Sequence, residues 1–192
     1  MANNRKPGRV RIIGGQWRGR LLEVARVDGL RPTTDRIRET LFNWLQPSLH
    51  SMRVLDLFAG TGALGFEALS RGAGELVLFE RDRAAAAALR RSAELLGANA
   101  TVHHCDARAR LAQSNDGAGF DLVFVDPPFA DNDMAQLCTL LDTNHWLTAD
   151  AIVYLEQARH NASSAPAPFV VQREKQVGDV CFALYGRDQE RG

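Results

Sequence analysis

The chain has 192 residues, of which 45% are hydrophobic and 24% are charged, and its formal net charge is +0. These values are typical of a single soluble domain with a core of its own. No apolar run reaches the about 20 residues that a bilayer span needs, and no apolar leader follows Met1. We therefore expect one main domain with a small appendage in a cytoplasmic protein without a membrane partner. The three cysteines, Cys105, Cys138 and Cys181, lie far apart, which favours buried thiols over disulfides.

Charge is distributed unevenly along the chain. Residues 1–40 contain ten Lys or Arg and four Asp or Glu, a net charge of +6, so the remaining residues carry −6. A basic segment on an acidic body favours a polyanionic partner, because clustered Lys and Arg release counterions when they contact phosphates. The alternative is a solvated segment that serves only solubility.

The basic segment contains a predicted β-hairpin. Residues 9–13 alternate basic and apolar, and residues 17–22 follow Gly14 and Gly15, which can make the turn. Its polar face would be almost entirely arginine. Trp17 could stack on a nucleobase while guanidinium groups bind phosphates, or it could anchor the hairpin to the body. The candidate RNA-binding residues are Arg9, Arg11, Gln16, Trp17, Arg18 and Arg20, together with Arg36 in the next segment.

Residues 31–45 predict a linker that enters a helix. A Thr or Asp can cap this helix, and an apolar stripe at helical spacing would face the core. The stripe consists of Ile37, Leu41, Phe42, Trp44 and Leu45. Thr33 and Thr34 lie on the loop before the helix, where polar groups could cover a bound cofactor.

A strand, a tight loop and a helix are predicted around Asp56. Gly60, Gly62 and Gly65 match G-x-G-x-x-G, and Glu80 follows at about the distance of the ribose-binding carboxylate in dinucleotide-binding folds. Asp56 favours another ligand, because its negative charge would lie close to a bound pyrophosphate. S-adenosylmethionine has no phosphate and carries an ammonium and a sulfonium, so an acidic loop suits it better. In that case Gly65 is a close-packing position in the helix.

Strands and helices alternate through the rest of the chain. A helix is expected over about 83–96, between Asp82 as its cap and Gly97 as its stop. Strands are expected at 75–80, 101–106, 120–126 and 151–156, followed by an antiparallel hairpin of 169–175 and 180–185. This alternation predicts an α/β fold with a parallel sheet covered on both faces, which binds ligands beyond the carboxyl ends of its strands.

Four successive strands end in an acidic residue, namely Asp56, Glu80, Asp106 and Asp126. Any one of them could be a helix cap, but together they predict an acidic crevice. Glu80 can accept both ribose hydroxyls of the donor, and Asp106 can accept its adenine amino group. Asp56 can hold the cationic end directly or through water.

The segment Asp126-Pro127-Pro128-Phe129 is the predicted site of chemistry. A strand cannot continue through two prolines, whose missing N–H groups leave nearby carbonyls free to point into the crevice. Asp126 and the Pro127 carbonyl can each accept an N–H bond from an exocyclic amine, turning its lone pair toward the methyl group, while Phe129 stacks on the base. This is catalysis by positioning and electrostatics.

No metal site is expected. His103 and His104 are adjacent, so on a strand they point to opposite faces and cannot chelate one ion. No Ser or Cys has a recognisable nucleophile context, and no P-loop pattern occurs.

With these motifs the chain resembles a known family. Residues 56–65 and 126–129 look like the donor-binding and catalytic motifs of Rossmann-like amino methyltransferases. Residues 14–20 and 31–42 narrow the resemblance to the rRNA small subunit methyltransferase D family, and the match runs from about Arg9 to Tyr185. One departure is Cys105, where such enzymes often have a glycine before the acid, which bears on the adenine-side assignment of Asp106.

The resemblance implies a class I S-adenosylmethionine-dependent methyltransferase with a seven-stranded doubly wound sheet, a terminal antiparallel hairpin and an N-terminal hairpin extension. It implies N2 methylation of one guanine in 16S rRNA, of the guanine-966 type, on an assembling 30S subunit, with S-adenosylhomocysteine as the other product. Asp126 to Phe129 would be catalytic. The candidate donor-binding residues are Asp56, Phe58, Gly60, Thr61, Gly62, Glu80, Arg81, Asp106, Ala107, Thr33 and Thr34.

We expect an RNA-binding hairpin arm over 1–30, the methyltransferase domain over 31–187, a disordered tail over 188–192, and a monomer. Three alternatives stay open. A DNA or RNA adenine N6 methyltransferase would share both Rossmann motifs, a dinucleotide-dependent oxidoreductase would share the glycine loop, and a non-catalytic RNA-binding module would have a crevice that binds no ligand.

Overall fold

The computed structural model describes residues 9–23, 34–127, 134–159 and 165–188. Its main feature is a seven-stranded sheet in the order β5-β4-β3-β6-β7-β9-β8. The strands are β3 (Arg53–Asp56), β4 (Glu75–Glu80), β5 (Ala100–His104), β6 (Phe120–Val125), β7 (Leu147–Ala158), β8 (Phe169–Val177) and β9 (Val180–Arg187). The first five in this order are parallel, whereas β9 pairs antiparallel with both β7 and β8. The predicted α/β architecture with its terminal antiparallel hairpin is confirmed.

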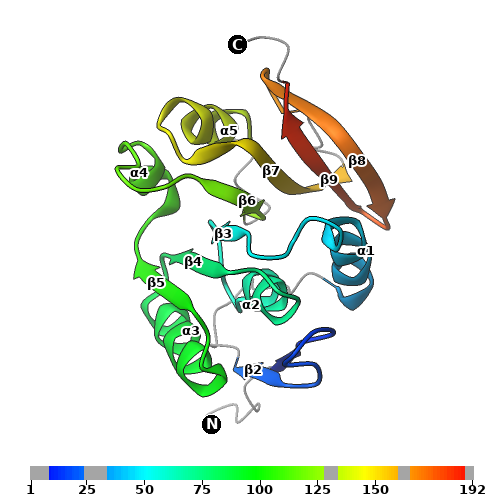
Figure 1. Ribbon diagram of the computed structural model, residues 1–192, viewed down its shortest axis with the longest axis vertical. Helices are drawn as coiled ribbons and strands as arrows, with labels where there is room; N and C mark the ends of the chain where they lie inside the picture. Colours follow the sequence, from blue (N-terminus) through cyan, green and yellow to red (C-terminus); the bar gives the residue numbers. More distant parts are fainter. Residues whose placement is uncertain (1–8, 24–33, 128–133, 160–164, 189–192) are drawn as a thin grey trace, which may run out of the picture.

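Helices cover both faces of the sheet, as Figure 1 shows. Three helices lie on one face, α1 (Asp35–Leu45), α2 (Ala63–Ser70) and α3 (Arg83–Leu96), and two lie on the other, α4 (Ala107–Leu111) and α5 (Met134–Thr143). The local signals for α3 predicted its ends correctly, because Asp82 caps it by accepting from the Ala85 N–H and Gly97 ends it with φ 59°. The short α4 and the helix α5 were not predicted, although Asp106 caps α4 by accepting from the Ala109 N–H.

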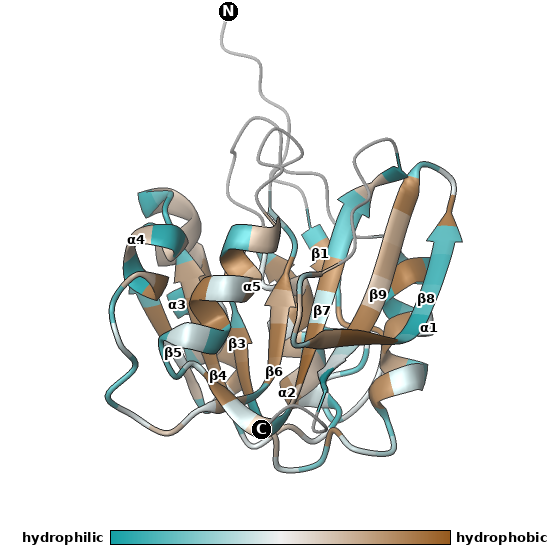
Figure 2. Cartoon of the chain, turned by 90° about the horizontal axis from the view of Figure 1, so that it is seen from above, coloured by the Kyte–Doolittle hydropathy of each residue, from teal (hydrophilic) through white to brown (hydrophobic). Residues whose placement is uncertain are grey.

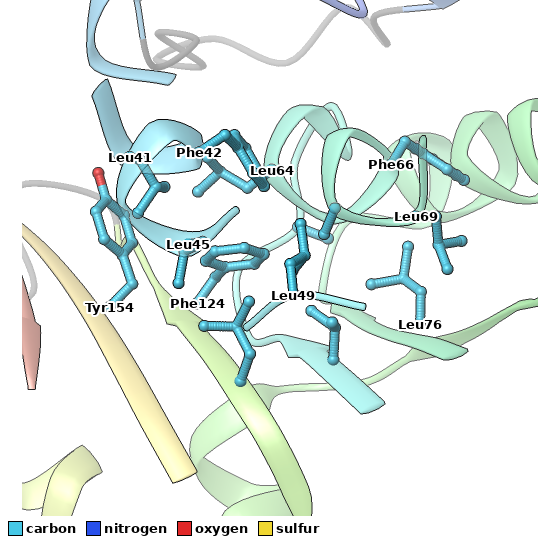
Figure 3. Close-up of a cluster of buried hydrophobic side chains, with 14 of the residues drawn as sticks. Leu41, Phe42, Leu45, Leu49, Leu64, Phe66, Leu69, Leu76, Phe124 and Tyr154 are labelled. Atoms are coloured by element: carbon cyan, nitrogen blue, oxygen red, sulfur yellow. The ribbon is translucent and has the colours of Figure 1, made fainter. Parts of the chain in front are cut away.

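The core on the α1 side is continuous from helix to sheet. Figure 3 shows side chains of α1 and α2 facing Leu76, Phe124 and Tyr154 of the sheet. The predicted stripe of α1 is confirmed, since four of its members are fully buried and Trp44 packs against Phe182 with ring centroids 5.4 Å apart. This packing fixes α1 and α2 against the strands whose ends carry the acids.

The edge strand β8 exposes a largely hydrophilic surface. Strand β8 is teal in Figure 2, whereas its neighbour β9 is brown. Residues 170–176 of β8 are exposed and include Arg173, Glu174 and Lys175. Charged side chains on an edge strand discourage pairing with another chain.

No helix in the described ranges is long and apolar enough to cross a membrane.

The N-terminal hairpin differs from the prediction. Its strands are only β1 (Arg9–Arg11) and β2 (Leu21–Glu23), with Arg11 paired to Leu21, so residues 12–20 form a loop in place of a tight turn at Gly14-Gly15. Ile12 and Leu22 are buried in the main core. The two glycines pack against α2, and this contact prevents them from closing a two-residue turn.

Several predicted features lie outside the described residues. They are Thr33, Pro128, Phe129, the boundary expected between residues 30 and 31, and nearly all of the expected tail. In the described parts, Cys105, Cys138 and Cys181 are free thiols, and only Cys138 is fully buried. Burial raises the pKa of the Cys138 thiol to about 12.

Candidate active site

The parallel strands bring the predicted acids to one edge of the sheet. In sheet order these are Asp106 after β5, Glu80 on β4, Asp56 on β3 and Asp126 after β6. Side chains alternate along a strand, and the residues two positions before Asp56, Glu80 and Asp126, such as Leu78 and Phe124, belong to the core under α1, α2 and α3. These three acids therefore belong to that same face, and Asp106 follows β5 at the same edge, which confirms that the four acids gather at one edge of the sheet.

The loop between β3 and α2 presents backbone. Gly60 and Gly62 have positive φ angles of 51° and 74°, which favour glycine. Gly62 also caps α2 without any side-chain hydrogen bond, and Phe66 and Leu89 leave no room for a Cβ there. A Cβ at Gly65 would lie 2.8 Å from Leu76 Cδ1, which confirms that Gly65 is a close-packing position. Thr61 beside them is buried.

Glu80 ties this loop to the neighbouring strand. Its Oε2 accepts from the Gly60 N–H at 2.8 Å, and its Oε1 accepts from the Asp82 N–H at 2.7 Å. Each carboxylate oxygen has two lone pairs, so both oxygens keep capacity for a ribose hydroxyl. The carboxylate is thus held at the place where the donor's ribose is expected.

Asp56 is more deeply buried than a charged loop residue would be. It is only 2% exposed, and burial, with a smaller contribution from the charge of Glu80, raises its pKa from 3.8 to about 7. The backbone N–H groups of Gly65 and Phe58 oppose this shift. Its Oδ2 is buried and has no hydrogen-bond partner among the described residues. A buried carboxylate oxygen without a partner fits a cationic ligand, and a cation there would favour the ionised form.

The expected adenine side lies at the ends of β4 and β5. Asp106 is exposed and caps α4, accepting from the Ala109 N–H at 2.9 Å through Oδ1, and Ala107 after it is buried. The Arg81 carbonyl is 3.0 Å from His104 Nε2. Phe58 is half-buried, with the Arg108 guanidinium 5.6 Å from its ring centroid. The capping role of Asp106 uses one carboxylate oxygen, Oδ1.

Asp126 and Pro127 follow β6, the strand next to β3 in the sheet. Asp126 is half-buried and Pro127 is buried. Phe124 is paired with Tyr154 of β7, and the Tyr154 hydroxyl donates to Glu156 Oε2 at 2.6 Å. Burial raises the pKa of Tyr154, and the charges of Glu156 and Asp126 raise it further.

Glu156 was not predicted as a site residue. It is 5% exposed and lies on β7, the fifth parallel strand of the series, beside the end of β6 and on the same face as Asp126, because residues 152 and 154 belong to the α1 side of the core. A signal existed, since the segment Tyr154-Leu155-Glu156 repeats the pattern of an apolar strand ending in an acid.

The candidate RNA-binding residues gather on the hairpin. Arg9, Arg11, Gln16, Arg18 and Arg20 are exposed, and Arg36 is exposed on the first turn of α1. Trp17 is half-buried and packs against the core, which is the arrangement of an anchor. Thr34 caps α1 by accepting from the Ile37 N–H at 3.4 Å.

A buried charged cluster under the hairpin was also missed. Glu67 of α2 is 0% exposed, and its Oε1 lies 2.7 Å from Arg71 Nε and its Oε2 3.7 Å from Arg38 Nη1. Arg38 is itself 1% exposed and pairs with Asp35 at 2.6 Å. Every residue of α2 is buried, so an acid in the middle of an otherwise apolar helix was the available signal.

No group of three or more His, Cys, Asp or Glu in the described ranges is arranged for a metal ion.

Comparisons with known proteins cover nearly the whole chain. A family model described as "Conserved hypothetical protein 95" matches residues 10–186. The chain is 46% identical over 190 residues to the ribosomal RNA small subunit methyltransferase D of Escherichia coli, covering 98% of this chain and 95% of that protein. It is 42% identical to the protein of the same name in Haemophilus influenzae, covering 93% and 94%. The solved structure of a putative methyltransferase from Escherichia coli superposes with a TM-score of 0.86 at 45% identity, covering 94% of this chain and 99% of that one.

Proposed function

Because the chain belongs to the ribosomal RNA small subunit methyltransferase D family, we propose that it transfers a methyl group from S-adenosylmethionine to N2 of one guanine in 16S rRNA. The observation that carries the proposal is the position of Asp126. It follows β6, directly beside the strand β3 whose end opens into the glycine loop. A nucleophile held by Asp126 would therefore lie next to a donor held by that loop.

The donor side uses groups on three neighbouring strands. S-adenosylmethionine supplies a methyl group that its sulfonium activates. The backbone at Gly60 and Gly62 leaves room for close approach, Glu80 accepts ribose hydroxyls, and Asp56 receives the cationic end. The adenine side is assigned to Asp106 with Ala107, Arg81 and Phe58. The names of the relatives support a methyl donor over a dinucleotide.

Asp126 positions the amine that is methylated. The exocyclic nitrogen of guanine is conjugated with its ring, so its lone pair is a poor nucleophile until the nitrogen becomes tetrahedral. Asp126 and the Pro127 carbonyl accept its two N–H bonds and turn the lone pair toward the methyl group. As the N–C bond forms and the C–S bond breaks, the nitrogen loses one proton, for which Asp126 is the nearest acceptor in this arrangement.

The exposed arginines of the hairpin provide the contact with RNA phosphates. The target base must leave its stack to reach Asp126, which costs about a few kcal/mol that phosphate contacts can offset. The substrate state that fits such a flipped base is the rRNA of an assembling 30S subunit, bound by one copy of the protein.

The proposal is tested by mass analysis of digested 16S rRNA from a strain without the gene. We expect N2-methylguanosine to be lost from one position, restored by the wild-type gene and not by Asp126→Ala, while purified Asp126→Ala still binds the donor in a calorimetric titration. Asp121→Asn is the matched control at the opposite end of β6, where Asp121 accepts from the Arg53 N–H at 2.8 Å. Methyl transfer by Asp126→Ala would contradict the mechanism. Loss of N6-methyladenosine in place of N2-methylguanosine from the rRNA of the strain without the gene would contradict guanine as the methylated base.

A further inference from the structure

The hairpin loop is bound to the same helix that begins at the glycine loop. Helix α2 starts after Gly62 and ends at Ser70, a length of about 12 Å. Its first residues border the candidate donor site, and its last turn holds residues 13–17 of the hairpin. In Figure 1 the hairpin lies beside α2 and α3, on the side of these helices that faces away from the sheet.

The contacts between the hairpin loop and α2 are made by backbone groups of the loop. Glu67 accepts from the N–H groups of Ile13 and Gly14, each at 2.7 Å. Ser70 accepts from the Trp17 N–H at 2.9 Å and donates its hydroxyl to the Gly14 carbonyl at 2.6 Å. The Ser70 carbonyl also accepts from the Gln16 N–H at 2.7 Å. Hydrogen bonds on two oxygens of one carboxylate and on one serine fix the orientation of the loop as well as its place.

The site on α2 that binds the hairpin loop, formed by Glu67 and Ser70 and called the seat below, is also defined by charged groups. Glu67 is buried between the guanidinium groups of Arg71 and Arg38, and Arg38 Nη2 also donates to the Arg11 carbonyl of β1 at 2.9 Å. A buried carboxylate needs such partners, because burial without them is costly. Apolar packing alone would leave the loop free to slide, whereas these bonds are directional.

We propose that Glu67 and Ser70 are positioning residues that set the RNA-contacting arginines of the hairpin at a fixed place relative to the donor loop. The backbone of the loop binds α2 while the side chains of Arg18 and Arg20 remain exposed. This inference rests on the proposed function, since it assigns to α2 the task of joining the RNA surface to the methyl donor. Removing the seat should weaken RNA binding and leave donor binding in place.

Two glycines of the same loop offer a matched pair of variants. Gly15 has φ +75°, and an added Cβ would lie 1.7 Å from the Ser70 carbonyl oxygen, so Gly15→Ala must lift the loop from its seat. Gly19 has φ +86°, and a Cβ there meets nothing within 4 Å. Both substitutions carry the strain of a positive φ, but only one disturbs the contact with α2. Neither removes a charge or a polar side chain.

The experiment measures the affinity of the full-length variants for 16S rRNA as a function of salt, and for S-adenosylmethionine by calorimetry. For Gly15→Ala we expect about a tenfold weaker affinity for RNA and a log–log salt slope shallower by about one to two, as for the loss of one or two phosphate contacts. Its donor affinity should stay within about twofold of wild type. Gly19→Ala should match wild type in both. Equal RNA affinity and slope for the two variants would overturn the inference.

A second set of variants keeps the test decisive if Gly15→Ala does not fold. Ser70→Ala removes the hydroxyl that binds Trp17 and Gly14, and we expect the same loss of RNA affinity with donor binding retained. Adding Glu67→Gln to Arg18→Ala/Arg20→Ala should cause little further loss, because Glu67 acts through those arginines. Additive losses would contradict the positioning role. If the wild-type protein neither binds nor methylates rRNA, it is the proposed function that fails.

Discussion

Replacing Asp56 by Asn should make the protein more stable and a poorer binder of the donor. The pKa of Asp56 is raised from 3.8 to about 7 in the folded chain, mainly by burial. Between these values the folded state binds more protons at Asp56 than the unfolded state, so the contribution of Asp56 to stability is greatest below pH 3.8 and falls as the pH rises to about 7. The total loss is about 4 kcal/mol at 1.36 kcal/mol per pKa unit.

The stability effect of Asp56→Asn should therefore depend on pH. At pH 5 most of this loss has not yet occurred, whereas at pH 8 it is complete. Asp56→Asn should therefore raise the free energy of unfolding by about 3 kcal/mol more at pH 8 than at pH 5. Taking the difference between the two pH values cancels any cost of fitting the amide near the N–H groups of Gly65 and Phe58. Denaturant unfolding of both proteins at both pH values measures it.

Donor affinity should change in the opposite direction. If the cationic end of S-adenosylmethionine needs an ionised Asp56, the ionised fraction falls about tenfold between pH 8 and pH 6, and the affinity of the wild type falls with it. The affinity of Asp56→Asn should be weaker, and the ratio of the two affinities should carry the pH dependence. The donor's own amine also titrates, but it does so equally for both proteins. A constant ratio, or an equal stability effect at both pH values, would refute this account of Asp56.

Two further variants test the packing and the RNA surface. Gly65→Ala would place a Cβ 2.8 Å from Leu76 Cδ1 and 3.3 Å from Asp56 Oδ2, so we expect a loss of about 1–3 kcal/mol in the free energy of unfolding, measured by urea denaturation; no loss would mean that α2 can shift. Simultaneous replacement of three exposed arginines should weaken rRNA binding and flatten its salt dependence without changing the unfolding midpoint, and unchanged affinity would contradict the role of the hairpin. These are Arg11, Arg18 and Arg20.

The parts of the fold that the sequence predicted are those with local signals. Asp82 and Gly97 mark the ends of α3 because capping depends on a few neighbouring backbone groups. The acids at the strand ends could be placed together because parallel strands bring their carboxyl ends to one edge. The predicted Rossmann-like class I methyltransferase fold is confirmed by the sheet order and by the solved structure of the related methyltransferase.

The parts that were missed depend on contacts between distant segments. Gly14 and Gly15 were predicted to form a tight turn, which their local sequence permits. In the structure this part of the chain is bound by Glu67 and Ser70, which lie more than fifty residues further along the sequence. A local pattern does not show which backbone N–H groups a buried carboxylate will bind. Glu156 is a different case, because its partner Tyr154 is only two residues away on the same strand. What depends on distant segments is its place next to Asp126, which follows from the pairing of β7 with β6.

The acidic edge explains why the glycine motif alone was ambiguous. Glu80 and Asp56 are close enough for the charge of Glu80 to raise the pKa of Asp56, and Asp126 and Glu156 together raise that of Tyr154. Carboxylates gathered on one face of a sheet repel each other, and burial adds to the cost of ionising them. A phosphate would increase this repulsion, whereas a ligand bearing an ammonium and a sulfonium would relieve it. The ionised carboxylates thus cost the free protein most stability at high pH, which is also where they bind a cationic donor best. Binding of such a donor should therefore raise the unfolding free energy more at pH 8 than at pH 6.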